Sequence, residues 1–221
     1  MNVEITTRKR YPVEDEVLFR LYQRSFQQWR DNGIEAKFLS QDIEYFKNAT
    51  KWASFVLAVP IPNEELKDNS TEPVGMLCFN CYKDKHAFDF YLTVAPEAKH
   101  QGIGTRMLEY AVERLKNHGF KYIVDTTSVD ATWSVKWHLK NGYRIVGFGK
   151  GHKPYSDTYM FRKQIAPSLL WTGPLAPLTA KCCYLFWRIV RLLTQRSSDG
   201  EFNGLGKLLK KLKNRIRRTT N

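Results

Sequence analysis

The chain has 221 residues, enough for one sizeable core and an appendage, and its 43% hydrophobic, 14% aromatic and 26% charged residues are typical of a globular protein. The first residues hold no apolar run of the kind that a secretory signal needs, and four cysteines are too few for a disulfide framework. We therefore expect a protein of the reduced cytoplasm, without a metal or redox role for its cysteines.

The net charge of +13 is concentrated at the C-terminal end. Residues 204–221 contain seven of the 35 Lys and Arg residues and no acid, which leaves 28 basic against 22 acidic residues elsewhere, a net charge of +6. The charge therefore indicates a partner for the tail more than for the core.

In chain order, residues 2–7 alternate as an edge strand does. Residues 13–31 place apolar side chains at helical spacing and end at an Asn-Gly stop, which predicts one helix. Residues 40–48 predict a second, short helix with Ser40 as its N-cap. Three strand-like runs separated by turn-forming residues follow, at 52–60, 74–82 and 87–94.

A longer helix is predicted next, because apolar residues recur at helical spacing from Ile103 to Leu115, just before Gly119. The remaining elements are a strand at 121–128, a helix at 131–142 and two strands at 143–149 and 157–163. This order combines hairpins with β-α-β crossovers and predicts one mixed α/β sheet with helices on both faces. After Gln164 the composition changes, so we predict a domain at 1–165 and an extension at 166–221.

Residues 94–108 join a strand to a helix through a Gly-x-Gly turn. A Rossmann fingerprint needs a third glycine where this chain has Met107, and a P-loop needs Gly-Lys-Ser/Thr where it has Gly104-Thr105-Arg106. The free N–H groups of a first helical turn still favour an anion, and glycines let a ligand approach the backbone. The alternative is a glycine-softened helix start with no ligand.

Val-x-Pro followed after two residues by Lys-His-Gln-Gly-Ile-Gly-Thr resembles motif A of the GNAT superfamily, the acyl-CoA-dependent N-acetyltransferases. The family pattern is Gln/Arg-x-x-Gly-x-Gly/Ala after the fourth strand. Lys99 stands at the Gln/Arg position, where it keeps a cation near phosphate but lacks the planar fork of arginine. The resemblance covers residues 1–165 and implies a GNAT-like mixed β-sheet flanked by helices, followed here by a basic helical C-terminal extension.

The resemblance also implies how acetyl-CoA binds. The thioester end would lie along the fourth strand, on main-chain atoms of Leu92, Thr93 and Val94, with the strands splayed beyond Val94. An amide there can stabilise the thioester oxyanion. The diphosphate would lie beside Lys99, on the amides of His100, Gln101, Gly102, Ile103, Gly104 and Thr105.

Acyl transfer to an amine needs a base for the amine and an acid for the leaving thiolate. The family often places a Tyr acid in the pattern Asn-x-x-Ala-x-x-x-Tyr-x-x-x-Gly-Phe. Here Ala131 and His138 stand at the Asn and Tyr positions, and Gly142-Tyr143 matches the end. The resemblance therefore implies His138 as the acid. The alternative is a histidine that packs against the sheet without chemistry.

For the base, the resemblance points to Asp89 on the fourth strand. Strand alternation puts Asp89 on one face with Tyr91 and Thr93 unless a bulge intervenes. Some family members use a fifth-strand Glu, but Thr126 stands at that position and Asp125 points the opposite way, so we expect no base from the fifth strand. A solvated or capping Asp89 is the alternative.

Aromatic residues of the early helices, the last helix of the domain and the last hairpin are candidates for an acceptor pocket, although such residues are more often core. They are Tyr22, Phe26, Trp29, Tyr45, Trp133, Trp137 and Tyr155.

The tail resembles an amphipathic helix that lies on a membrane. Five apolar residues from Leu205 to Ile216 repeat at helical spacing among lysines and arginines, and residues 182–190 form an apolar run too short to span a bilayer. We predict that 181–218 binds an anionic membrane surface, which places the protein peripherally on the inner face of the membrane. The alternatives are an apolar run packed on the domain with a solvated basic helix, and, less favoured, nucleic acid.

Three functions are compatible with the sequence. The leading one is an acyl-CoA-dependent N-acyltransferase that moves an acetyl group from acetyl-CoA, its co-substrate, to a primary amine without a metal. The second is a non-catalytic GNAT-like module that binds CoA. The third is a nucleic-acid- or ribosome-associated protein that binds through the basic tail.

Overall fold

The computed structural model describes residues 1–36, 39, 41–61, 72–151, 155–167 and 176–194. The predicted basic helix from Leu205 to Ile216 lies outside these residues. The elements are β1 (Val3–Thr7), α1 (Asp15–Ser25), α2 (Gln27–Asp31), α3 (Ile43–Thr50), β2 (Ser54–Pro60), β3 (Gly75–Cys81), β4 (His86–Val94), the 3-10 turn η2 (Pro96–Ala98), α4 (Ile103–Asn117), β5 (Tyr122–Ser128), α5 (Thr132–Lys140), β6 (Tyr143–Gly149), β7 (Thr158–Gln164) and α6 (Ala176–Thr194).

In the described part of the chain, seven strands form one mixed sheet in the order β1-β2-β3-β4-β5-β7-β6. Neighbouring strands pair antiparallel except β4 and β5, which are parallel. A parallel pair needs a crossover, and α4 provides it. α5 is a second crossover, because β5 and β6 are each antiparallel to β7 and so run in the same direction.

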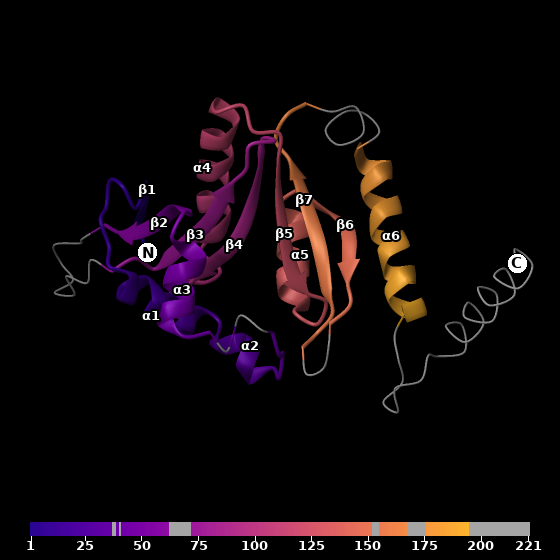
Figure 1. Ribbon diagram of the computed structural model, residues 1–221, viewed down its shortest axis with the longest axis horizontal. Coiled ribbons are helices and arrows are strands. Elements are labelled where there is room, and N and C mark those ends of the chain that lie inside the picture. Colours follow the sequence, from indigo (N-terminus) through magenta and orange to yellow (C-terminus); the bar gives the residue numbers. More distant parts are fainter. Residues whose placement is uncertain (37–38, 40, 62–71, 152–154, 168–175, 195–221) are drawn as a thin grey trace, which may run out of the picture.

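Helices cover both faces of the sheet, as predicted. The two crossovers advance the same way along the sheet, so right-handed connections put α4 and α5 on one face. Figure 1 shows these two helices behind the strands and α1 and α3 in front. The apolar residues that recur at helical spacing in the sequence lie on the buried faces of these helices. The most deeply buried core side chains of α1, α3 and α4, each at most 2% exposed, include Leu18, Tyr22, Phe46, Met107, Leu108 and Ala111.

Two helix predictions need correction. The helix predicted over 13–31 is two helices, because the backbone leaves helical geometry at Phe26 (φ −92°, ψ 5°). Ser25 contributes to the break: its hydroxyl donates to the Leu21 carbonyl, a bond that bends helices. The predicted N-cap Ser40 lies outside the described residues. α3 is capped instead by Asp42, whose carboxylate accepts from the Tyr45 N–H at 2.8 Å.

The last described helix, α6, packs along β6, the strand at the edge of the sheet (Figure 1). Tyr184 and Trp187 face the core, and α6 thereby covers a strand edge that would otherwise expose unpaired backbone groups. No helix among the described residues has the length and apolar character needed to cross a membrane.

Candidate active site

A cleft opens between the two parallel strands at the centre of the sheet. Residues 86–88 of β4 pair with residues 122–124 of β5, although the strands run on to Val94 and Ser128. Past the paired segment the strands diverge, as Figure 1 shows, and border a cavity of about 690 Å³. The splay therefore begins after residue 88, and the prediction that it begins beyond Val94 was wrong.

Because the cleft cuts through the sheet, residues from both faces of each strand border it. The consecutive residues 92–94 of β4 line the cavity, and so do residues 125–127 of β5. Alternation along a strand therefore does not decide which side chains reach this cavity. For this reason the expectation that Asp125 points away from the site was wrong, since Asp125 lines the cavity, whereas the expectation of no base from the fifth strand stays a prediction.

A bulge in β4 separates Asp89 from Tyr91. In the ladder with β3, Cys78 pairs with Tyr91, and the next residue of β3, Phe79, pairs with Asp89. Residue 90 of β4 therefore has no partner on β3. The Tyr91 ring packs toward α1, with its centroid 5.0 Å from that of Tyr22. Asp89 instead lies opposite Phe79 in the ladder and lines the same cavity as Asp125, which bonds to His138 of α5. The bulge that the sequence analysis allowed for is therefore present, and Asp89 and Tyr91 do not share a face.

His138 and Asp125 form a buried pair. Nε2 of His138 lies 2.6 Å from Oδ2 of Asp125, and the two residues are 5% and 7% exposed. Nδ1 lies 2.7 Å from the carbonyl oxygen of Ser134, which can only accept, so Nδ1 carries a proton. The ring also stacks on Phe161 at 4.6 Å. Both nitrogens are thus engaged within the protein, and the acid role of His138 stays a prediction.

Asp89 has fewer hydrogen bonds than Asp125. It is 2% exposed, and neither of its oxygens has a hydrogen-bond partner among the described residues. Burial, and then the charge of Asp125, raise the pKa of Asp89 well above its ordinary value. The hydroxyl of Tyr143 is also buried nearby without a described partner, and burial raises its pKa as well. A buried carboxyl with a raised pKa close to a second carboxyl is a common arrangement for proton transfer.

The Gly-x-Gly turn leads into an uncapped helix. Gly102 is the N-cap of α4 at φ +74°, a left-handed conformation that favours glycine, and it has no side chain to cap the N–H groups of the first turn. Gly104 packs closely on β4, since an added Cβ would lie 3.3 Å from the Leu92 side chain. Ile103, Gly104 and Thr105 all line the cavity, so the positive end of α4 faces it.

Nine of the ten residues predicted to hold the coenzyme line this cavity, and Gln101 does not. The Gln101 side chain instead accepts from the N-terminal amine of Met1 at 2.8 Å. Lys99 lines the cavity, but its ammonium donates to the Gln28 side chain at 2.9 Å, and burial lowers its pKa. Whether these residues bind the coenzyme stays a prediction.

The predicted acceptor aromatics divide into two groups. Phe26, Trp29, Tyr45, Trp133 and Trp137 line the cavity, and the rings of Trp29 and Trp133 meet edge to face at 6.2 Å. Tyr22 and Tyr155 do not line it: the first is fully buried in the core and the second is 40% exposed. Those two predictions were wrong. Helical spacing identified the buried face of α1, which holds Tyr22, and not the part that borders a cavity, while Tyr155 lies in the connection between β6 and β7.

Sequence reasoning assigned no role to Asp125 or to the polar residues around His138. Thr127 and Ser134 join their hydroxyls at 2.9 Å beside that ring, and Thr105 donates to Asn141 at 3.0 Å, which ties α4 to α5. One signal was available. Asp125 shares a strand face with the buried Ile123, and a carboxylate on a buried face needs a partner.

Comparison with known proteins agrees with this geometry. The sequence profile of the acetyltransferase (GNAT) family matches residues 16–143. Among curated proteins, none matches the chain. The ribosomal-protein-S18-alanine N-acetyltransferase of Escherichia coli superposes with a TM-score of 0.58 and 13% identity, over 76% of this chain and 96% of that one.

Two other solved structures are similar. A GNAT-family acetyltransferase from Staphylococcus aureus Mu50 has a TM-score of 0.55 and 16% identity, over 75% of this chain and 100% of that one. One from Elizabethkingia anophelis, solved with acetyl-CoA bound, has a TM-score of 0.53 and 17% identity, over 74% and 98%. At these identities the structures establish a shared fold alone. Since the family profile spans more than half of the sequence, the chain belongs to the GNAT acetyltransferase family.

Proposed function

We propose that the protein is an acyl-CoA-dependent N-acyltransferase that transfers an acetyl group from acetyl-CoA to a primary amine. The observation that carries the proposal is a single cavity that joins three features. These are the uncapped N-terminus of α4, the diverging strands β4 and β5, and a buried group of two carboxyls and an imidazole.

The residues present fit the coenzyme. The first-turn N–H groups of α4 and the backbone from His100 to Thr105 suit the diphosphate, with Lys99 at the edge. Beyond residue 88, β4 has no ladder partner on the β5 side, so its main chain near Leu92 to Val94 is free to bind the pantetheine amides. Bound there, acetyl-CoA supplies the activated acetyl thioester.

The chain's own side chains would manage the protons. We assign Asp89 as the base that accepts the proton of the amine, because a raised pKa makes a carboxylate a stronger base. Asp125 and His138 hold a second proton between them, at Nε2 or at the carboxyl. In this role His138 is the acid for the leaving thiolate, and Asp125 positions its ring. The aromatic walls around Trp29 and Trp133 receive the acceptor.

The test combines coenzyme binding with turnover. Acetyl-CoA at about 100 times its Kd is expected to stabilise the wild-type protein by about 2.7 kcal/mol, or roughly 5–10 °C in Tm. Gly104→Asp places a side chain and a negative charge in the diphosphate site and is expected to abolish the shift. Gly102→Asp serves as a second variant, because an added side chain there meets nothing within 4 Å and Asp is among the non-glycine residues that best tolerate the left-handed φ of +74°.

An equal shift in the wild type and both folded variants would overturn the binding site. Thioester consumption across a panel of primary amines then separates the enzyme from a non-catalytic CoA-binding module. A clear shift without acetylation of any amine would favour the module.

We further propose that the enzyme works on an anionic membrane surface, which for a cytoplasmic protein is the inner face. One side of α6 packs on β6, and the opposite side exposes large apolar residues at helical spacing: Leu178, Leu185, Phe186 and Ile189, each at least 45% exposed. Exposed Lys181 and Arg188 accompany them, and α6 contains no acid. An exposed apolar face with basic flanks is typical of a helix that lies in the membrane interface.

Vesicle cosedimentation tests this placement. We expect the full chain to bind phosphatidylglycerol vesicles and Leu185→Glu/Phe186→Glu to lose more than about tenfold in binding, since each buried side chain contributes about 1.5–3 kcal/mol. Trp52→Glu is the matched control, because Trp52 is 81% exposed on another part of the surface. Equal sedimentation of all three proteins, or preferential binding of RNA by the full chain at physiological salt, would contradict the proposal.

A further inference from the structure

A second cavity lies at the other end of α4. Its volume is about 660 Å³, and it shares no lining residue with the cleft between β4 and β5. The ends of β1, β2 and β3 border it, together with Arg114, Leu115 and His118 of the last turns of α4. A helix of 15 residues is about 22 Å long, so the two cavities are well separated.

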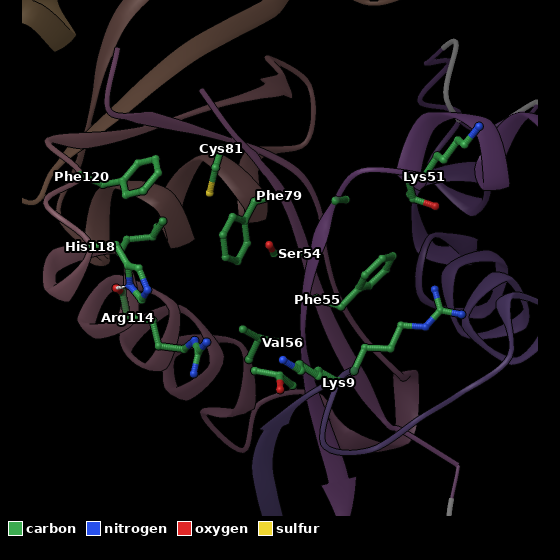
Figure 2. A pocket seen from close by; sticks show the side chains of 15 residues that line it. Lys9, Lys51, Ser54, Phe55, Val56, Phe79, Cys81, Arg114, His118 and Phe120 are labelled. Carbon is green, nitrogen blue, oxygen red and sulfur yellow. Dashed lines mark hydrogen bonds between the residues drawn. The ribbon is translucent and has the colours of Figure 1, made fainter. Parts of the chain in front are cut away.

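The second cavity has an apolar floor and a basic rim. The floor is built from Phe55, Val56, Phe79 and Leu115, all buried, and the half-buried Phe120. The cations that line it are Arg8, Lys9, Lys51 and Arg114, with His118 beside them, and none of its lining residues is an acid. Figure 2 shows Lys9 extending past Val56 toward Arg114, while Lys51 points away from this part of the cavity.

Lys9 and Arg114 lack an acidic partner among the described residues, although the Arg114 guanidinium lies 5.9 Å from the Tyr110 ring centroid. Arg8 is neutralised by Asp15 at 2.7 Å, whereas Lys9 and Arg114 form no ion pair with any residue that the structure describes. Both are exposed. Helix C-termini attract cations, and α4 ends here, but a helix end carries only about half a negative charge. Two full positive charges therefore leave an excess that this dipole does not neutralise.

We propose that this cavity binds an amphipathic anion: a molecule with a carboxylate or phosphate head and an apolar body. The head lies between Lys9 and Arg114, and the apolar body covers Val56, Phe79 and Leu115. The volume is within the range of about 300–1,000 Å³ that is usual for small-molecule sites. This site is independent of the proposed acetyl transfer, since it shares no residue with the cleft.

Cys81 is a reporter within the cavity wall. It is an exposed free thiol that lines the cavity, while the exposed Cys182 of α6 is outside it. Octanoate is the probe, and peptide mass spectrometry follows the rate at which iodoacetamide alkylates each thiol. Octanoate is expected to slow alkylation of Cys81 at least threefold and to leave Cys182 unchanged. Octylamine, with the same chain and opposite charge, is expected to give no protection, and inorganic phosphate less than octanoate.

Charge reversal sharpens the test. Lys9→Glu/Arg114→Glu is expected to remove the protection by octanoate and to lower the ratio of iodoacetate to iodoacetamide reactivity at Cys81. Partial desolvation of its sulfur raises the pKa of the exposed Cys81 thiol, but this affects both reagents equally and cancels in the ratio. Arg10→Glu/Lys116→Glu is the matched control, with the same change in charge at exposed residues that do not line the cavity.

Four results would overturn the proposal. They are no protection of Cys81 by octanoate in the wild type, equal protection by octylamine, equal protection in the charge-reversed and control variants, and protection by phosphatidylglycerol vesicles but not by octanoate. The last would assign this face to a lipid surface.

Discussion

The two ends of α4 offer an anion two different kinds of binding group, backbone N–H groups at one end and side-chain cations at the other. At its N-terminus, uncapped backbone N–H groups face a cleft that also holds a buried imidazole and two carboxyls. At its C-terminus, where the helix dipole is negative, side-chain cations on the surface surround an apolar floor. The first arrangement is built from the backbone and buried groups, and the second from exposed side chains.

The difference predicts how each site responds to change. A site made of N–H groups tolerates most side-chain substitutions but depends on glycines and on the position of the helix. Its buried polar groups are costly to disturb, because removal of one partner leaves the other unsatisfied in the interior. Exposed cations can be reversed with little effect on folding, and their contribution falls with salt.

The largest expected effect is on stability. Asp125→Ala leaves His138 without its buried partner and is expected to lower the free energy of unfolding by about 3–5 kcal/mol, or roughly 10 °C in Tm. Lys9→Ala at the exposed rim is expected to change it by less than about 0.5 kcal/mol. Denaturant unfolding monitored by circular dichroism measures both.

Asp125→Asn is the matched control, because its amide can donate to a neutral imidazole and keep the pair satisfied. It is expected to cost much less than Asp125→Ala. If the alanine variant were as stable as Lys9→Ala, the pair would contribute nothing to the fold, and the comparison between buried and exposed charges would fail.

The second prediction concerns turnover. If His138 is the acid, His138→Ala lowers kcat by roughly ten- to a thousand-fold and leaves the affinity for CoA near that of the wild type. Arg10→Glu/Lys116→Glu, outside both cavities, is expected to leave kcat unchanged. Steady-state kinetics with a separate CoA titration makes the distinction. An unchanged kcat in folded His138→Ala would return the residue to packing against Phe161.

Most of the fold was predictable because local patterns encode it. Turn residues and alternation located the strands, and helical spacing from Ile103 to Leu115 located the helix that follows the glycine turn. The prediction of one helix over 13–31 was wrong because a side-chain hydrogen bond competes there with the regular helical backbone. Ser25 interrupts the first helix by bonding to the carbonyl of Leu21, and such a bond leaves no periodic signal.

The site was less predictable because it depends on where strands part. Nothing in the sequence marks the bulge that separates Asp89 from Tyr91, or the point where β4 and β5 stop pairing. These two features decide that Asp125 reaches the cavity and meets His138. The glycine turn was predictable, because an uncapped helix N-terminus depends on backbone chemistry that the sequence shows directly.

The third prediction separates the two carboxyls by pH. Asp89 has a raised pKa, so the folded state binds its proton more tightly than the unfolded state, and stability is lost as pH rises from the unfolded pKa through the folded one. Asp89→Asn is expected to remove that loss, as Tm measured against pH would show.

The same carboxyl should govern the pH dependence of the rate. As a base, Asp89 must be ionised, so kcat/KM should rise with pH through the same raised pKa. The asparagine variant should lose this rise and be about tenfold or more slower. A rise that persists in Asp89→Asn belongs to another group and would remove Asp89 from the base role.

The smallest expected effect is the response of the second cavity to salt. Between 0.1 and 1 M salt the Debye length falls from about 10 to about 3 Å, so exposed charges interact less. Two exposed contacts of about 0.2–1 kcal/mol each hold the head group in our proposal, so complete screening would lower octanoate affinity at Cys81 by roughly two- to thirtyfold. Salt strengthens the burial of apolar chains, and 1-octanol, which lacks the charge, measures that opposing effect. An octanoate affinity that follows the octanol curve would show that Lys9 and Arg114 do not hold the head group, and the contrast between the two ends of α4 would then rest on the backbone site alone.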